Sequence, residues 1–161
     1  MLPTCDSDTT DDGFEILSFE LSSSRKERAA LERPRVLLAD DHRAMLDREV
    51  SLLQSNFEVV GIVNDGRALV SEAHRLQPDV IVLDITMPIM TGIEAAHELR
   101  KSGSTAKLIF LTVHQEAAFV HRCFSEGGIA YVIKSRMVID LIPAINEALS
   151  DHPFVSPSVP H

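Results

Sequence analysis

The fold of this chain follows from the stretch Val80-Ile81-Val82-Leu83-Asp84-Ile85-Thr86-Met87-Pro88. Its four leading apolar residues are typical of a strand that is buried on both faces of a sheet. Pro88 cannot extend that strand, because proline has no N–H to donate. Asp84 is therefore expected at the carboxyl end of a buried strand, where open parallel sheets gather their reactive groups. Taken alone, such an aspartate more often simply ends a strand and caps a turn, so the rest of the sequence has to decide.

Strand and helix patterns alternate on both sides of this stretch. Apolar runs predict five strands, at residues 36–39, 59–63, 80–83, 108–111 and 129–133. Apolar residues at helical spacing predict five helices, with inward faces within 46–53, 69–76, 93–99, 120–124 and 138–149. Five β-α units with right-handed crossovers make an α/β fold, a doubly wound five-stranded parallel sheet with helices on both faces.

The composition excludes several classes of protein. The net charge of −9 argues against direct nucleic-acid contact by this segment, because phosphate binding needs clustered Lys and Arg. No apolar run approaches the ~18 residues of a membrane span. The two cysteines, Cys5 and Cys123, lie far apart and predict no disulfide framework, which favours a reducing, cytoplasmic setting. The seven histidines have no metal-ligand spacing and predict no zinc site.

The chain divides into three expected segments. Residues 1–34 are rich in Asp, Ser and Thr and predict an acidic, disordered leader. Within the leader, residues 14–21 form an apolar island that suits a short strand, a docking peptide or a patch on the domain. Residues 35–150 form the α/β domain. Residues 151–161 are interrupted by prolines and predict a linker-like tail.

Polar residues follow several of the predicted strands. Asp40 and Asp41 follow the first strand, Thr112 ends the fourth and Lys134 follows the fifth. In a parallel sheet these side chains converge with Asp84 on one rim. Each has an ordinary structural explanation, such as a helix cap, a hydroxyl bonded to backbone or a solvated lysine. Together they supply complementary chemistry, which favours a functional site.

The charges of these residues indicate the chemistry. Carboxylates held close together repel one another unless a cation intervenes. Mg²⁺ suits such a site, because it binds carboxylate oxygens and phosphate oxygens alike. Asp84 would then serve as an oxygen nucleophile for phosphoryl transfer. Lys134 would neutralise charge on the phosphoryl group, and the Thr112 hydroxyl would donate to one of its oxygens.

These residues resemble the receiver domains of two-component response regulators, which have the flavodoxin-like, CheY-like (βα)5 fold. The resemblance covers residues 35–149. The motifs that carry it are Leu38-Ala39-Asp40-Asp41-His42, Leu83-Asp84-Ile85-Thr86-Met87-Pro88, Gly92, Leu111-Thr112 and Tyr131-Val132-Ile133-Lys134. Residues 61–66 and 153–157 are similar to the NarL-type subgroup, in which such a tail leads into a DNA-binding domain.

The resemblance implies roles for particular residues. Asp84 would accept a phosphoryl group from a sensor histidine kinase. Asp40 and Asp41 would hold Mg²⁺ together with Asp84, helped by the backbone carbonyl of Thr86. The resemblance also allows a homodimer.

A second set of implied roles concerns the switch. Thr112 and Tyr131 would relay the phosphorylated state to the surface, with the Tyr131 ring passing from a partly solvated position to a packed one. Thr86 and His114 would flank the path of the water that removes the phosphoryl group.

Three features depart from the family pattern. Ser135 follows the lysine where the family usually has proline, so the usual cis peptide bond is in question. The sequence ends at His161, which leaves no room for an output domain of ~60 residues. The acidic leader has no counterpart in a typical receiver.

Two alternatives stay open at this point. One is an aspartyl-phosphate-forming phosphohydrolase of the haloacid-dehalogenase type, which Asp84-Ile85-Thr86 loosely resembles. Those enzymes place their metal-binding acidic residues after the nucleophile, whereas the acidic pair here precedes Asp84. The other is the front part of a NarL-type DNA-binding transcriptional regulator, which a longer reading frame would reveal.

Overall fold

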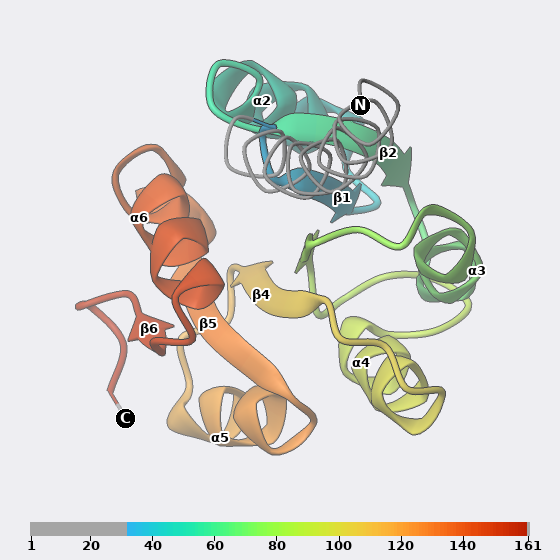
Figure 1. Cartoon of the computed structure of the whole chain (residues 1–161). Coiled ribbons are helices and arrows are strands. Elements are labelled where there is room, and N and C mark those ends of the chain that lie inside the picture. The colour runs from blue at the N-terminus through green and yellow to red at the C-terminus, as the bar shows by residue number, and fades with distance from the viewer. Residues whose placement is uncertain (1–31, 161) are drawn as a thin grey trace, which may run out of the picture. The chain divides into compact units, whose positions relative to one another are not determined.

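A parallel sheet forms the centre of the computed structural model, which describes residues 32–160 (Figure 1). The strand order is β2-β1-β3-β4-β5-β6, and every neighbouring pair is parallel. The strands are β1 Arg35–Ala39, β2 Glu58–Val63, β3 Val80–Leu83, β4 Lys107–Thr112, β5 Gly128–Ile133 and β6 Phe154–Val155. The helices are α2 Arg43–Leu53, α3 Gly66–Leu76, α4 Gly92–Lys101, α5 Ala117–Ser125 and α6 Met137–Leu149, with a short 3-10 turn, η1 Lys134–Arg136, before α6.

Helices cover both faces of the sheet, with α2 and α6 on one side and α3, α4 and α5 on the other (Figure 1). Successive strand residues point to opposite faces, so each inner strand contributes to both halves of the core. In β3, Val80 and Val82 pack toward α2 and α6, whereas Ile81 and Leu83 pack toward the other three helices. This two-sided burial explains the unbroken apolar runs from which the strands were predicted. The doubly wound α/β fold is confirmed.

Within residues 32–160 the sheet has six strands, and the prediction of five was wrong on this point. Phe154 and Val155 pair in parallel with Ala130 and Tyr131 of β5. The prolines on either side of these two residues suggested a linker. Proline lacks only its own N–H, so Pro153 and Pro157 leave the backbone groups of the residues between them free to pair. The limits of the three expected segments stay a prediction, and most of the leader lies outside the described residues.

Two other expectations concern peptide geometry and the membrane. No peptide bond among residues 32–160 is cis, so the Lys134–Ser135 bond is trans. Within the same residues, no helix combines the length and the apolar character that crossing a membrane requires.

Gly92 fixes the path of the chain immediately after Asp84. Its N–H donates to the Ile85 carbonyl over 2.7 Å, and a Cβ at this position would collide with the backbone carbonyl of Asp84. Thr91 begins α4 by accepting the N–H of Glu94 on its hydroxyl. The start of α4 is thereby held against the strand end that carries the aspartate.

Gly92→Ala is expected to destabilise the fold by about 2 kcal/mol or more, because rigid backbone would have to move to admit the methyl group. Gly103 offers a matched control: its φ of +89° disfavours alanine, but no atom lies within 4 Å of the added Cβ. Gly103→Ala should therefore cost only about 1 kcal/mol. Urea unfolding of both variants measures the two costs, and equal values would show that the contact with Asp84 is not tight.

Candidate functional site

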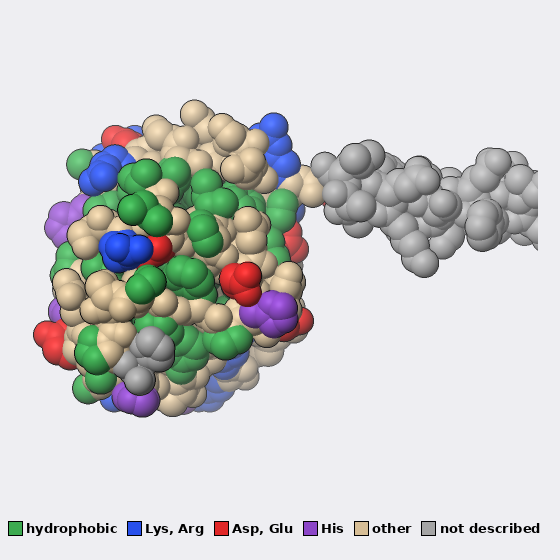
Figure 2. Space-filling view, turned by 90° about the vertical axis from the view of Figure 1, so that its left-hand side faces the viewer, with side chains coloured by type: hydrophobic (Ala, Val, Ile, Leu, Met, Phe, Trp, Pro, Cys, Tyr) green, Lys and Arg blue, Asp and Glu red, His purple; other side chains and the backbone are tan. Residues whose placement is uncertain are grey.

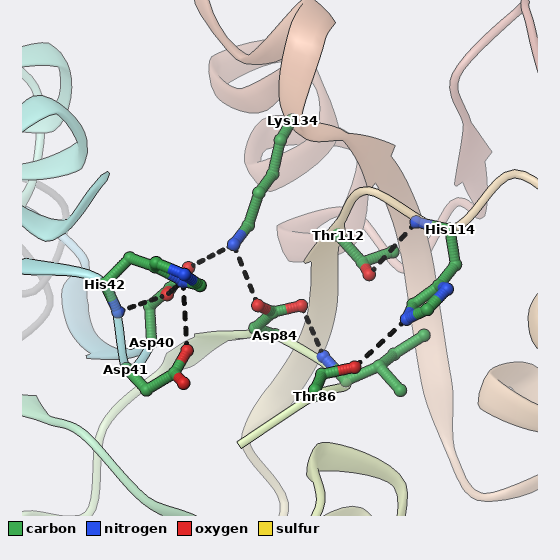
Figure 3. Close-up of polar contacts among 9 residues, drawn as sticks. Asp40, Asp41, His42, Asp84, Thr86, Thr112, His114 and Lys134 are labelled. Carbon is green, nitrogen blue, oxygen red and sulfur yellow. Dashed lines mark hydrogen bonds and ion pairs between the residues drawn. The ribbon is translucent and has the colours of Figure 1, made fainter. Parts of the chain in front are cut away.

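The carboxyl ends of the central strands bring the predicted polar residues together on one rim (Figure 3). Asp40 follows β1 and Asp84 follows β3, and their backbone N–H groups donate to carbonyls of the neighbouring strands. Thr112 ends β4, and Lys134 follows β5. All four side chains are buried, so the sheet itself creates a compact polar centre with little access to water.

Lys134 closes this centre. Its Nζ lies 2.7 Å from Asp40 Oδ2 and 2.8 Å from Asp84 Oδ2. Burial lowers the pKa of the Lys134 ammonium, but the hydrogen bonds to the two carboxylates outweigh that effect and leave its pKa above the ordinary value. Lys134 is therefore a charged cation shared between two buried anions, an arrangement in which losing one partner is costly.

Asp41 and His42 lie at the open side of the centre. His42 Nδ1 is 3.1 Å from Asp41 Oδ1 and 3.3 Å from Asp40 Oδ1, and the His42 N–H donates to Asp40 Oδ1 over 2.8 Å. The N-cap of α2 is His42, and its side chain makes no capping hydrogen bond. The explanation of Asp40 or Asp41 as a plain N-cap of this helix therefore does not hold.

The donor set suits a hard divalent cation. One ligand atom from each of Asp40, Asp41, His42 and Asp84 can be chosen so that all lie within 4.8 Å of one another. Three of the four are carboxylates, which Mg²⁺ prefers over an imidazole. The cluster could therefore hold a metal ion through its aspartate oxygens.

His114 contacts three other residues that were predicted to act at the site, Thr86, Thr112 and Tyr131. Its Nε2 lies 3.0 Å from Thr86 Oγ1, and its backbone N–H donates weakly to Thr112 Oγ1 over 3.4 Å. Its carbonyl accepts the Tyr131 hydroxyl over 2.8 Å. Its ring stacks on Phe119 of α5, with the ring centroids 4.3 Å apart. One loop residue thus joins the loop after β3, the end of β4 and the middle of β5 to α5.

Tyr131 departs from its expected starting position. The ring is completely buried, with 0% of its surface exposed, and its hydroxyl already has a partner in His114. The expectation of a partly solvated ring is therefore wrong for this conformation. The apolar alternation of β5 points Tyr131 into the core, and the loop carbonyl satisfies its only polar atom.

The sequence analysis missed Glu49. This α2 residue is only 1% exposed, and its Oε2 atom has no hydrogen-bond partner. Burial and the nearby charge of Asp40 raise its pKa to about 8, although Lys134 opposes the shift. Helical spacing offered a signal, because Glu49 lies three residues after Leu46 and four before Leu53, on the face that enters the core.

The fold and the site together define a class of domain. Its sheet is flavodoxin-like, and the carboxyl rim of that sheet carries acidic side chains paired with one lysine. The sequence model of the response regulator receiver domain matches residues 36–146, and the chain belongs to this family. The expected resemblance is thus confirmed. The comparisons lend no support to the haloacid-dehalogenase alternative.

Several relatives show what the chain is similar to. It is 37% identical over 123 residues to the transcriptional regulatory protein PdtaR of Mycobacterium tuberculosis, covering 76% of this chain and 59% of that protein. A LuxR-family response regulator from Aurantimonas sp. SI85-9A1 superposes with a TM-score of 0.76 at 29% identity, over 80% of this chain and 93% of that one. The receiver domain of a NarL regulator from M. tuberculosis gives 0.71 at 26% identity, over 74% and 98%. The chain spans less than two thirds of the length of PdtaR and of other curated relatives that it matches.

Glu49 should make stability depend on pH. The folded state keeps a proton up to about pH 8 that the unfolded chain releases near 4.5, so stability falls as the pH rises through this window. Each pH unit within this window lowers the free energy of unfolding by at most about 1.4 kcal/mol. Urea unfolding of Glu49→Gln between pH 5 and 8 should show a flatter slope than wild type. The exposed Glu58→Gln is the control, and a wild-type slope in Glu49→Gln would contradict this account.

Proposed function

We propose that Asp84 accepts a phosphoryl group from the phosphohistidine of a sensor histidine kinase, with Mg²⁺ held by Asp40, Asp41 and Asp84. The backbone carbonyl of Thr86 would complete the protein's share of the metal ligands. The observation that carries the proposal is the buried Lys134 ammonium shared by Asp40 and Asp84. It places a fixed positive charge beside the carboxylate at which phosphoryl oxygens would arrive.

The transfer forms one bond and breaks one. An oxygen of Asp84 attacks phosphorus, the P–N bond of the donor imidazole breaks, and the imidazole leaves with the electron pair and takes up a proton. Lys134 then turns from Asp84 to a phosphoryl oxygen, and the Thr112 hydroxyl donates to another. When bound, Mg²⁺ would neutralise negative charge on the donor's phosphoryl oxygens. The domain would thus catalyse its own phosphorylation and, slowly, its own dephosphorylation.

The surface around the site supports the proposal that another protein donates the phosphoryl group. The exposed large hydrophobic side chains of residues 32–160 are Ile62, Ile89, Val113, Val138 and Ile139. Each lies at the carboxyl end of a strand, in the loop that follows one, or in the first turn of α6. Exposed apolar groups gathered around a polar centre are typical of a surface that binds another protein. A cavity of about 440 Å³ beside Asp40 and Asp41 leaves room for a donor group.

Two further expectations extend the proposal beyond this domain. The similarity to a DNA-binding response regulator of the LuxR family from Staphylococcus aureus supports a DNA-binding output elsewhere in a longer protein. The net charge of −9 supports the absence of direct nucleic-acid contact by this segment. Hydrophobic side chains cover much of the face on which α6 and β6 lie (Figure 2), which supports a homodimer. Relay through Thr112 and Tyr131, and a cytoplasmic setting, stay predictions.

Phosphorylation should depend on Asp84. Incubation with phosphoramidate and Mg²⁺ should add one phosphoryl group that hydroxylamine removes, as intact-mass spectrometry will show. Asp84→Asn should lose this labelling, whereas Asp47→Asn, which changes an exposed aspartate of α2, should keep it. Labelling of Asp84→Asn at the wild-type rate would remove the assignment.

Asp41 is expected to lower the stability of the metal-free fold and to strengthen Mg²⁺ binding. It adds a negative charge that Lys134 does not pair, so Asp41→Asn should raise the melting temperature by about 2 °C in the absence of metal. The same change should weaken Mg²⁺ binding at least about tenfold, or by ~1.4 kcal/mol. Calorimetry and thermal unfolding measure the two effects. A variant that loses stability yet binds Mg²⁺ normally would show that Asp41 serves the fold alone.

Thr86 and His114 should govern the lifetime of the phosphorylated form. Their side chains are 3.0 Å apart beside Asp84, in position to flank an attacking water. Thr86→Asn or His114→Glu should change the dephosphorylation rate by up to about 100-fold, the lower end of what one positioned proton acceptor contributes, and leave phosphorylation nearly intact. Single-turnover measurements separate the two rates, and equal changes in both would assign the pair to folding or metal geometry.

A further inference from the structure

The carboxyl-terminal tail is attached to the strand that delivers Lys134. The Ser156 hydroxyl accepts the Ile133 N–H over 3.1 Å and donates to Asp140 Oδ2 over 2.8 Å. The Ser156 N–H donates to the Tyr131 carbonyl over 2.9 Å. Ser156 is fully buried and Asp140 nearly so, so water cannot replace these contacts. Ile133, which the serine holds, is the residue immediately before Lys134.

The local sequence explains why a serine is needed here. Residues 156–159 form a turn in which the Val159 N–H donates to the Ser156 carbonyl over 3.0 Å, with Pro157 at the second position. The turn ends β6, so no backbone carbonyl of the tail continues the ladder toward Ile133. A hydroxyl can accept from Ile133 and donate to Asp140 at the same time, which an alanine cannot do.

Asp140 also holds the other end of the Lys134 turn. Arg136, the last residue of η1, donates from Nε to Asp140 Oδ2 over 2.7 Å and from Nη2 to Oδ1 over 3.2 Å. The two-pronged contact fixes the orientation of the guanidinium as well as its distance. Hydrogen bonds therefore hold the chain on both sides of Lys134. Ser156 holds Ile133 on one side and Asp140 holds Arg136 on the other, and Ser156 itself is bonded to Asp140.

We propose that Ser156 and Asp140 are positioning residues for Lys134, so that the tail holds the ammonium between Asp40 and Asp84. This inference rests on the proposed function for its effect on phosphorylation, but not for its effect on metal binding. With the tether cut, Lys134 would sample other positions, and its charge would reach the incoming phosphoryl group less often. The same loosening would uncover Asp40 and Asp84, which are expected to bind Mg²⁺.

The two effects have opposite signs, which separates positioning from general damage. A variant that merely loosens the fold should weaken Mg²⁺ binding and phosphorylation together. A variant that releases Lys134 should slow phosphorylation and strengthen Mg²⁺ binding, because the ammonium competes with the cation for the same carboxylates.

The test compares Ser156→Ala with Ser158→Ala in the full chain, since Ser158 is an exposed serine of the same tail. Mg²⁺ binding is measured by calorimetry, and the phosphorylation rate with phosphoramidate by intact mass. Ser156→Ala should bind Mg²⁺ about threefold more tightly, since a competing charge has left. It should acquire the phosphoryl group about tenfold more slowly, because its charge donor is displaced. Ser158→Ala should match wild type in both.

The outcomes distinguish the two proposals. If Ser156→Ala matches Ser158→Ala in both measurements, or loses Mg²⁺ affinity, the positioning role is overturned. If wild type takes no phosphoryl group, the proposed function fails, and the Mg²⁺ comparison still decides the positioning role. Should Ser156→Ala not fold, Asp140→Asn replaces it, because the amide keeps an acceptor for Ser156 and releases the charge that holds Arg136. The same opposite signs are expected from it.

Discussion

The burial of the Lys134 ammonium between Asp40 and Asp84 is the interaction on which the site depends. The parallel sheet brings two carboxylates to adjacent strand ends, where there is little water to separate their charges. Without a cation between them, the two carboxylates would repel each other and destabilise the sheet that places them together. A lysine from the end of β5 supplies that cation, at 2.7 Å and 2.8 Å from the two carboxylates. The site therefore stabilises its own geometry only while the lysine stays in place.

The same arrangement leaves the centre poised between two ways of balancing its charge. Lys134 balances only part of the negative charge, because it supplies one positive charge for two carboxylates and Asp41 lies beside the pair. A divalent cation would balance the rest, and a phosphoryl group on Asp84 would give the lysine a new partner. The contacts of His114 and of Ser156 hold the rim that carries the site against α5 and the carboxyl-terminal tail.

Local sequence patterns predicted most of the fold and the residues that the site brings together. Unbroken apolar runs identified β3 and its neighbours, and parallel strand order alone was enough to expect Asp84 and Lys134 on one rim. The features that were missed depend on contacts between distant residues. The residues near Phe154 do not indicate that it pairs with Ala130, and the prolines on either side suggested a linker instead. Helical spacing places Glu49 on the inner face of α2, but that a carboxyl group there is almost fully buried beside Asp40 depends on how α2 packs against the sheet.

A double-mutant cycle on Lys134 and Asp84 tests the central claim most directly. Free energies of unfolding are measured without metal for Lys134→Met, Asp84→Asn and the double variant. The account predicts that Lys134→Met alone loses about 3 kcal/mol, because it leaves buried carboxylates unpaired. Adding Asp84→Asn should restore a large part of that loss, since one of those charges is then gone. A Lys134→Met variant as stable as wild type, or a double variant with strictly additive losses, would contradict the account.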